Sequence, residues 1–373
     1  MFNGTCPPKK SRRIAPSTSE ITAAPDPPPT TVTRSENGPD LNANLRLVQL
    51  PPELFDAIME QYATLPSNFY YDTQNIPELK YYERNDALTA LSQTCRVLRQ
   101  ITLPRLWESL DMCRIPERER HTWYSYIMLA IARKANGISD SPVRHYVRTL
   151  TIMFSRSQPD AALAALWNML PKLPNLRMIH VINCKTPGFA KSLTDSKLKL
   201  PNVRTLFLPT EGCVFQRICP NATHIRCVGG GGMALTSEVT DKTEVFDGMV
   251  DWKDLKLVDR LVKKAPNLRK LEIRRPVNWG LGIDSQNEAP AQWAQVIPRL
   301  APLQHLTDLI LTFPAAEEKP GDAGTIAAAR QLMQGKTAVR GERRLTIRRI
   351  AARHYSNPGS EEDVLHSRVM ETF

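Results

Sequence analysis

Residues 174–184 read P-N-L-R-M-I-H-V-I-N-C, and their apolar residues follow the spacing L-x-x-L-x-L-x-x-C. Leu176, Ile179 and Val181 occupy the first three positions, and Cys184 occupies the last. Residues two positions apart lie on one face of an extended chain, so the spacing predicts a short strand with one buried face, followed by a turn. The apolar part of the spacing recurs at Val147, Leu150 and Ile152; Val203, Leu206 and Leu208; Ala222, Ile225 and Cys227; Leu268, Leu271 and Ile273; and Leu306, Leu309 and Leu311.

Runs with helical spacing lie between several of these strands and predict an α/β fold. They occupy residues 160–170, 254–264 and 291–300. The strand spacing resembles that of leucine-rich-repeat proteins, which implies a solenoid of stacked repeats. The same alternation is compatible with a doubly wound parallel sheet. The recurring phrase P-N-L-R favours the solenoid, so we predict an irregular leucine-rich-repeat-like α/β solenoid over residues 141–315.

The intervals between these repeats are unequal, which indicates irregular units. The two longest, from Ala222 to Leu268 and from Leu268 to Leu306, could each hide a degenerate repeat. Only the unit that ends at Cys184 has a cysteine or polar residue at the turn position. The sequence therefore leaves open whether a hydrogen-bond ladder connects the turns.

Three short helices are predicted within residues 50–110. In the first, L-P-P-E-L-F-D-A-I-M, Pro52 suits the first helical position. In the second, which contains A-L-S-Q-T-C-R-V-L-R, Asp86 is the expected N-cap, and Pro104 is expected to interrupt the helical pattern before P-R-L-W-E-S-L. The apolar residues at helical spacing are Leu54, Phe55, Ile58 and Met59, then Leu88, Leu91, Cys95 and Leu98, and finally Leu106, Trp107 and Leu110.

The Leu-Pro pair, the Cys-Arg-x-Leu-Arg helix and the Leu-Trp-Glu element together resemble an F-box, and the chain resembles F-box-like proteins of fungi. The resemblance implies that residues 45–112 form a three-helix F-box-like domain, with an unusually long insertion at about 63–85. It also implies a substrate-receptor subunit of a Skp-cullin type ubiquitin ligase. By this resemblance Leu50, Pro51, Leu54 and Ile58 meet the Skp-type adaptor, and Leu91, Cys95, Leu98 and Trp107 pack the domain or complete the contact.

The segments around these two regions have their own character. Residues 1–44 are rich in Pro, Ser and Thr, and we predict a disordered, basic arm. Residues 113–140 contain a connecting helix with Trp123, Ile127 and Ile131 facing inward and Gly137 as its stop signal. Residues 316–373 are predicted to be a basic C-terminal cap or tail. Lys9, Lys10, Arg12 and Arg13 are a nuclear-import candidate or a solvated charge run.

Composition limits the classes of protein. The 373 residues contain no apolar run long enough for a membrane span, and the first residues lack the apolar core of a signal peptide. The seven cysteines, an odd number, fit free thiols better than a disulfide framework. We therefore expect the protein in the cytoplasm, the nucleus or both.

No motif predicts catalysis, a cofactor or a metal. The four glycines of residues 229–232 are not followed by the Lys-Ser or Lys-Thr of a phosphate loop. No nucleophile elbow or catalytic pair is recognisable. The potential zinc ligands lack paired C-x-x-C spacing: Cys213, Cys219, His224 and Cys227. We therefore expect a protein that is not an enzyme.

Strand residues between the apolar anchors should point to the opposite, concave face of the solenoid. The candidates for binding a protein substrate are Met178, His180, Ile182, Phe207, Arg226 and Arg274. Large apolar residues on such a face favour a contact role, and we expect Met178, His180 and Phe207 to be accessible.

Two alternatives to the substrate receptor remain open. One is a protein-binding solenoid scaffold that has lost adaptor binding. The other is a basic nucleic-acid or membrane binder, because the net charge is +11 and arginines crowd one C-terminal segment with helical spacing. No recognised nucleic-acid module accompanies that segment. The partners that the F-box resemblance implies are a Skp-type adaptor, a cullin complex and a protein substrate. The arginines are Arg340, Arg343, Arg344, Arg348, Arg349 and Arg353.

Overall fold

One mixed sheet runs through the computed structural model, and its strands lie in the order in which they occur along the chain. Strands β1 to β9 are parallel to their neighbours, and β10 is antiparallel to β9. The strands are β1 (Ser109–Met112), β2 (Thr149–Met153), β3 (Met178–Asn183), β4 (Thr205–Pro209), β5 (His224–Gly229), β6 (Val245–Met249), β7 (Lys270–Arg274), β8 (Asp308–Pro314), β9 (Arg344–Ile350) and β10 (Leu365–Thr372).

The structure describes residues 48–65, 77–116, 122–156, 159–184, 186, 188–229, 232–249, 255–274, 291–314, 320–335, 342–350 and 365–373. These residues all fall within one compact unit, Asn42–Phe373. The predicted arm of residues 1–44 lies outside the described residues, and so does the nuclear-import candidate. The same holds for residues 66–76 of the predicted insertion.

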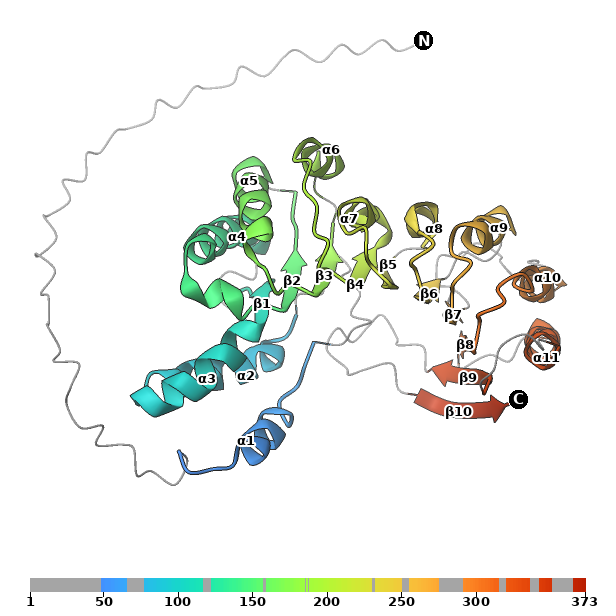
Figure 1. The fold of residues 1–373 in the computed structure, drawn as a ribbon, viewed down its shortest axis with the longest axis horizontal. Helices are drawn as coiled ribbons and strands as arrows, with labels where there is room; N and C mark the ends of the chain where they lie inside the picture. The colour runs from blue at the N-terminus through green and yellow to red at the C-terminus, as the bar shows by residue number, and fades with distance from the viewer. Residues whose placement is uncertain are drawn as a thin grey trace, which may run out of the picture. The chain divides into compact units, whose positions relative to one another are not determined.

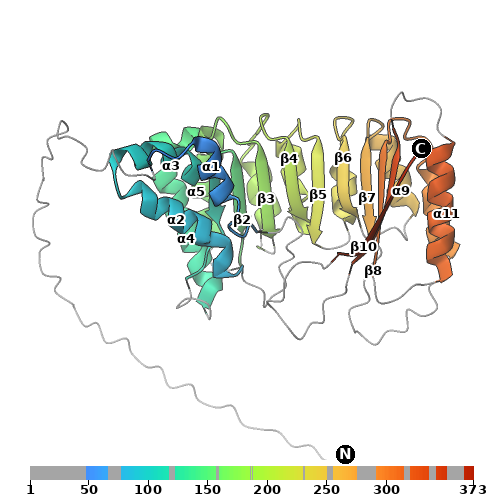
Figure 2. The same ribbon diagram turned by 90° about the horizontal axis from the view of Figure 1, so that it is seen from below.

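Helices α4 to α11 lie along one face of this sheet (Figures 1 and 2). A doubly wound sheet would reverse its strand order and carry helices on both faces. The described strands and helices show neither feature, so that alternative is wrong. These elements are α4 (Trp123–Ser139), η3 (Pro142–His145), α5 (Pro159–Met169), η4 (Leu170–Lys172), α6 (Phe189–Asp195), η5 (Thr210–Gly212), α7 (Val214–Ile218), α8 (Met233–Glu238), α9 (Leu255–Lys264), α10 (Ala291–Arg299) and α11 (Pro320–Gln334).

The predicted apolar anchors form the main core between the sheet and these helices. Every anchor of the strand spacing is buried, from Val147 to Leu311. Strand register places the central anchors side by side, so that burial of each depends on its neighbours. The central row contains Leu150, Ile179, Leu206, Ile225, Phe246, Leu271, Leu309 and Leu345.

A degenerate unit does occupy the interval between Ala222 and Leu268, because β6 lies there. Its three anchor positions are Thr243, Phe246 and Gly248, all buried, so two of the three anchors are not large apolar residues. Gly248 has φ +82°, and a Cβ on it would lie 2.6 Å from the carbonyl oxygen of Cys227. The close approach of β5 requires glycine at this position.

Asparagines at the starts of the repeats form a hydrogen-bond ladder from one repeat to the next, a feature that the sequence left undecided. Asn202 Nδ2 donates to the carbonyl oxygen of Pro174 at 2.9 Å, and Asn221 Nδ2 donates to that of Pro201 at 3.0 Å. Each of these prolines directly precedes the asparagine of the previous repeat, so the donor and acceptor lie at neighbouring positions of successive units. Asn175 and Asn267 donate to the preceding units in the same way. The asparagine in P-N-L-R therefore joins one unit to the next.

The N-terminal helices are α1 (Pro52–Met59), η1 (Leu79–Tyr82), α2 (Glu83–Ser92) and α3 (Arg96–Glu108). The predicted second helix is two helices, because the Sγ of Cys95 caps α3 by accepting from Leu98 N at 3.4 Å. Asp86 lies in the first turn of α2 and is not an N-cap. Pro104 lies inside α3, where Arg105 Nη1 donates to the carbonyl oxygen of Ile101 at 2.9 Å in the turn that lacks the proline donor.

Two further expectations change in the structure. Helix α4 passes through Gly137 and ends at Ser139. Gly137 has no positive φ, and a Cβ added there would meet nothing within 4 Å, so the helix does not have to stop at this residue. The segment of residues 316–373 continues the sheet through β9 and β10. Arg344, Arg348 and Arg349 lie on β9, so their helical spacing does not correspond to a helix. None of the described helices has the length and apolar content needed to cross a membrane.

Candidate functional site

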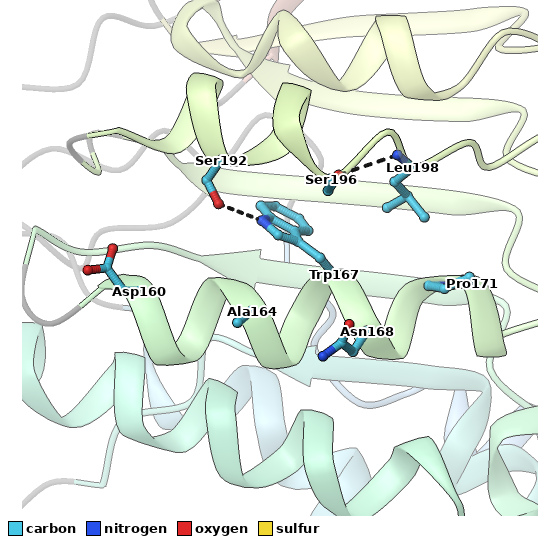
Figure 3. Close-up of a pocket in the computed structure, with 8 residues that line it drawn as sticks. All are labelled: Asp160, Ala164, Trp167, Asn168, Pro171, Ser192, Ser196 and Leu198. Atoms are coloured by element: carbon cyan, nitrogen blue, oxygen red, sulfur yellow. Dashed lines mark hydrogen bonds between the residues drawn. The ribbon is translucent and has the colours of Figure 1, made fainter.

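A groove lies on the helix side of the sheet, between α5 and α6 (Figure 3). Its volume is about 500 Å³, and Trp167 forms part of its wall. The indole Nε1 of Trp167 already donates to Ser192 Oγ at 2.9 Å. The groove contains none of the residues that the sequence singled out as candidates, and its tryptophan offers an apolar surface with no spare donor.

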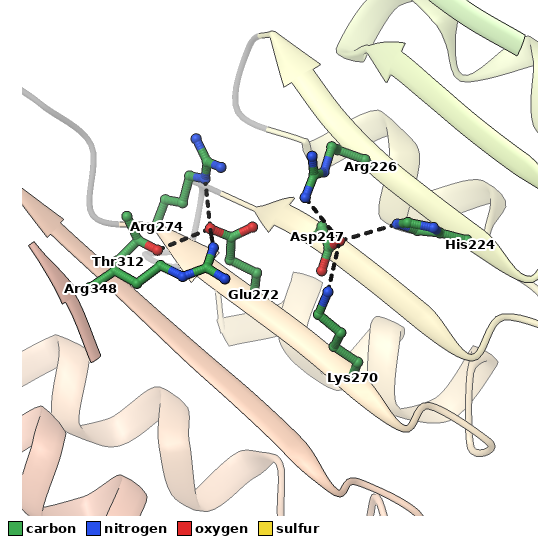
Figure 4. A network of polar contacts seen from close by, with 8 residues as sticks. All are labelled: His224, Arg226, Asp247, Lys270, Glu272, Arg274, Thr312 and Arg348. Atoms are coloured by element: carbon green, nitrogen blue, oxygen red, sulfur yellow. Dashed lines mark hydrogen bonds and ion pairs between the residues drawn. The ribbon is translucent and has the colours of Figure 1, made fainter. Parts of the chain in front are cut away.

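The opposite face of the sheet, which we call the helix-free face, carries a network of charged side chains over β5 to β9 (Figure 4). The ion pair between Glu371 of β10 and Arg330 of α11 shows which strand residues point to which face, because Glu371 must point to the helix side. Alternate residues on each strand, and their partners in register, therefore belong to the helix-free face.

Asp247 of β6 is the centre of one half of the network. Its Oδ2 lies 3.1 Å from His224 Nε2, 3.4 Å from Arg226 Nη2 and 3.4 Å from Lys270 Nζ. The side chain is 0 % exposed. Burial would raise the pKa of Asp247, but the hydrogen bond from His224 and the charges of Lys270 and Arg226 hold it below its ordinary value. Asp247 is therefore a buried anion with cationic neighbours on both adjacent strands.

Glu272 of β7 is the centre of the other half. Its Oε1 accepts from Thr312 Oγ1 at 3.0 Å and lies 3.1 Å from Arg274 Nε and 3.6 Å from Arg348 Nη1. Its side chain is 1 % exposed, whereas those of Arg274 and Arg348 are 24 % and 27 % exposed. The carboxylates thus lie beneath, and the cations form the accessible layer.

An aromatic row adjoins the network on β3 to β5. Phe207 contacts the rings of His180 and His224 edge-on, with centroids 5.6 Å and 5.5 Å apart. The guanidinium of Arg226 lies 5.3 Å from the Phe207 ring centroid. Burial, with help from the charge of Arg226, lowers the pKa of His180 to about 4, so this imidazole is neutral at pH 7.

The structure corrects part of the predicted substrate-binding set. Met178, Phe207, Arg226 and Arg274 are half-buried on the helix-free face, but His180 is only 5 % exposed and Ile182 only 2 %. The prediction that His180 is accessible is wrong. Every residue of β3 after Met178 is buried, so neighbouring side chains cover this strand on both faces and leave neither residue available as a surface contact.

The central residue Asp247 escaped the sequence analysis because β6 has no complete apolar spacing. The alternation that places Arg226 and Arg274 on this face also applies to His224, Lys270 and Glu272 of the same strands. Their convergence on two carboxylates depends on register between strands far apart in sequence. The phrase V-F-D-G-M supplies only an aspartate before a glycine, which by itself signals a turn.

The predicted adaptor-binding residues lie mainly around α1. Leu54 and Ile58 are 53 % and 47 % exposed, whereas Phe55 and Met59 on the same helix are buried against Leu88. The predicted single stripe thus divides into a buried and an exposed pair. Of the other candidates, Pro51 is exposed, Leu50, Leu91 and Trp107 are half-buried, and Leu98 is buried within the domain.

A scan against models of known protein families matches no part of the chain, and a search of curated proteins finds no significant relative. The residues that the structure describes also contain no group of three or more His, Cys, Asp and Glu side chains that could hold a metal ion. The candidate sites must therefore be interpreted from their own geometry. They are the exposed pair on α1 and the charged helix-free face.

Proposed function

We propose that the chain is the substrate-receptor subunit of an F-box ubiquitin ligase of the Skp-cullin type. In this proposal the N-terminal helices are an F-box-like domain that docks the adaptor. The strands and helices that follow are an irregular leucine-rich-repeat-like solenoid that holds a target protein. The sequence resemblance within residues 50–110 and the recurring strand spacing support these two assignments.

The observation that carries the proposal is the exposed apolar surface of α1. Leu54 and Ile58 are one helical turn apart and lie beside the exposed Pro51. Exposed leucine and isoleucine side chains on one face of a helix are typical of a protein interface. The resemblance assigns these residues to the adaptor contact, and their exposure suits that role.

An ion pair holds α1 in a fixed orientation on α3. Arg105 Nε lies 2.5 Å from Asp56 Oδ1, and Arg105 Nη2 donates to Asp56 Oδ2 at 2.9 Å. The same guanidinium lies 5.3 Å from the ring centroid of Phe55. A bidentate pair with a second contact is more specific in geometry than a single surface ion pair. The exposed face of α1 is therefore presented in a defined direction.

Polar contacts also connect the helical region to the first strand. Asn85 Nδ2 of α2 donates to Asp111 Oδ2 at 2.5 Å, and the Tyr82 hydroxyl lies 3.2 Å from Cys113 Sγ. A ligase of this type acts by proximity, because it raises the effective concentration of a target lysine near the conjugating enzyme. A rigid connection between adaptor site and target site serves that mechanism, and the chain itself needs no catalytic residue.

We expect the full chain to copurify with a Skp-type adaptor, and Leu54→Ser/Ile58→Ser to abolish the complex. Truncating two apolar anchors at an interface typically costs several kcal/mol, which is enough to remove detectable binding. The measurement is affinity capture of the purified chain, probed for adaptor and cullin, alongside a thermal melt of each variant.

Leu129→Ser is the matched control, because Leu129 on α4 is also 47 % exposed but lies outside the predicted adaptor contact. It should leave the complex intact. A chain that melts cooperatively but fails to bind any Skp-type adaptor would instead be a protein-binding scaffold without a ligase role.

A further inference from the structure

Arginines on the helix-free face form one row across the C-terminal strands. Register pairs Arg274 with Thr312, Thr312 with Arg348, and Arg348 with Arg368. Lys270 lies four residues before Arg274 on the same face of β7. We call Lys270, Arg274, Arg348 and Arg368 the cation face. The row in register, Arg274, Thr312, Arg348 and Arg368, contains three positive charges and no acidic residue.

The negative charges near the cation face lie beneath it. The side chains of Asp247 and Glu272 are 0 % and 1 % exposed, whereas Lys270 is 33 % exposed and Arg368 is exposed. The two carboxylates hold the ends of Lys270, Arg274 and Arg348 within 3.1 to 3.6 Å. Four cations over two anions leave a net positive surface whose charged groups are already positioned.

The pairing of β9 with β10 adds an independent indication. Arg348 and Arg368 are directly opposite each other in an antiparallel pair. Side chains at such positions have Cβ atoms roughly 5 Å apart, and like charges there are destabilising. An anionic group bound between the two guanidinium groups would remove this repulsion, so the arrangement favours a negatively charged partner.

The apolar neighbour of the cations indicates which kind of anion fits. Met370 lies two residues from Arg368 on the same face of β10 and is 55 % exposed. A polypeptide can alternate carboxylates with apolar side chains, so one segment could contact the arginines and Met370 together. The arrangement therefore favours an acidic segment that also carries apolar side chains.

We propose that the cation face binds an acidic segment of a partner polypeptide. Carboxylates of the segment would lie against Lys270, Arg348 and Arg368, and its apolar side chains would contact Met370. The inference rests on the proposed function, since it names the chemistry of the segment that the receptor captures. Its test contains no adaptor, so its failure and the failure of adaptor binding are separate results.

The test is a fluorescence titration of the full chain with a labelled peptide that alternates Glu and Leu. We expect saturable binding, no binding of the Gln-Leu counterpart, and at least about tenfold weaker binding to Lys270→Gln/Arg348→Gln/Arg368→Gln. The matched control is Arg148→Gln/Arg177→Gln/Arg204→Gln. It removes the same charge from three exposed residues that precede β2, β3 and β4, and should change the affinity less than about twofold.

Arg368→Glu provides a variant that keeps the fold, because Arg368 is exposed. It too should weaken binding at least about tenfold, and its melting temperature should not be lower, because the substitution replaces a like-charge pair with Arg348 by an opposite-charge pair. Equal losses in the site and control variants would mean that net charge alone attracts the peptide, and the proposal would fail. Tighter, equally site-dependent binding of a single-stranded oligonucleotide would also overturn it.

Two further arms identify the source of the negative charge. A peptide with phosphoserine in place of glutamate separates phosphorylated from acidic segments: both support the anionic site, and the tighter one names the source. The chain also contains its own acidic run, Glu361, Glu362 and Asp363. If peptide binds only after these three are replaced by serine, they are the occupant, and a partner segment is excluded.

Discussion

Ile179→Ala is expected to lower the free energy of unfolding by roughly 2 to 5 kcal/mol. Ile179 is 0 % exposed on β3, and register places it between Leu150 of β2 and Leu206 of β4. Truncation removes three carbon atoms from a position where hydrogen-bonded strands on both sides prevent collapse into the cavity. The loss should therefore fall in the upper half of that range, and urea unfolding of the full chain would measure it.

Phe207→Ala is the contrasting variant, since Phe207 is half-buried on the other face of the sheet. It loses two edge-on contacts and the Arg226 contact, which together are worth roughly 1.5 to 2 kcal/mol for a partly solvated ring. If Phe207→Ala destabilises the protein as much as Ile179→Ala, then Phe207 belongs to the core and the assignment of faces on β4 is wrong.

Gly248→Ala should destabilise the protein by roughly 2 to 4 kcal/mol. The left-handed backbone of Gly248 disfavours any side chain, and the added Cβ would lie 2.6 Å from the carbonyl oxygen of Cys227. The clash involves backbone atoms of β5, which cannot rotate away as a flexible side chain would. Relief would require β5 and β6 to separate, next to Asp247 and its ion pairs. Thermal and urea unfolding would report the change.

Gly137→Ala is the control for this variant. Gly137 lies inside α4, and a Cβ there meets nothing within 4 Å. Alanine should stabilise the helix by roughly 0.5 to 1 kcal/mol. Opposite signs for the two glycine variants are the expected result. A neutral Gly248→Ala would show that β5 and β6 do not approach each other as closely as described.

The strand spacing predicted the core well because burial imposes a strict period of two. The anchors around Ile179 and Leu271 are buried as expected, and the helical runs correspond to α5, α9 and α10. β6 was not recognised from the sequence, because Thr243 and Gly248 stand where the spacing requires two large apolar anchors. The short helices α6, α7 and α8 contain too few turns to show helical periodicity.

The candidate sites were predictable only in part. Alternation placed Phe207 and Arg274 on the helix-free face, but it cannot show that neighbouring strands bury His180 there. The charge network depends on Asp247, whose strand was not seen, and on Arg348, which the sequence placed in a segment with helical spacing. At α1 the sequence gives one apolar stripe. Only packing against Leu88 divides it into buried Phe55 and exposed Leu54.

Amide hydrogen exchange of the full chain, with and without a Skp-type adaptor, tests the central claim that α1 and the helix-free face serve different partners. We predict slower exchange in residues 48–60 on adaptor binding, because a docked helix opens less often. Exchange in residues 205–274 should not change. The account would be contradicted if exchange slowed in the strands but not in α1, or if exchange changed nowhere in the chain.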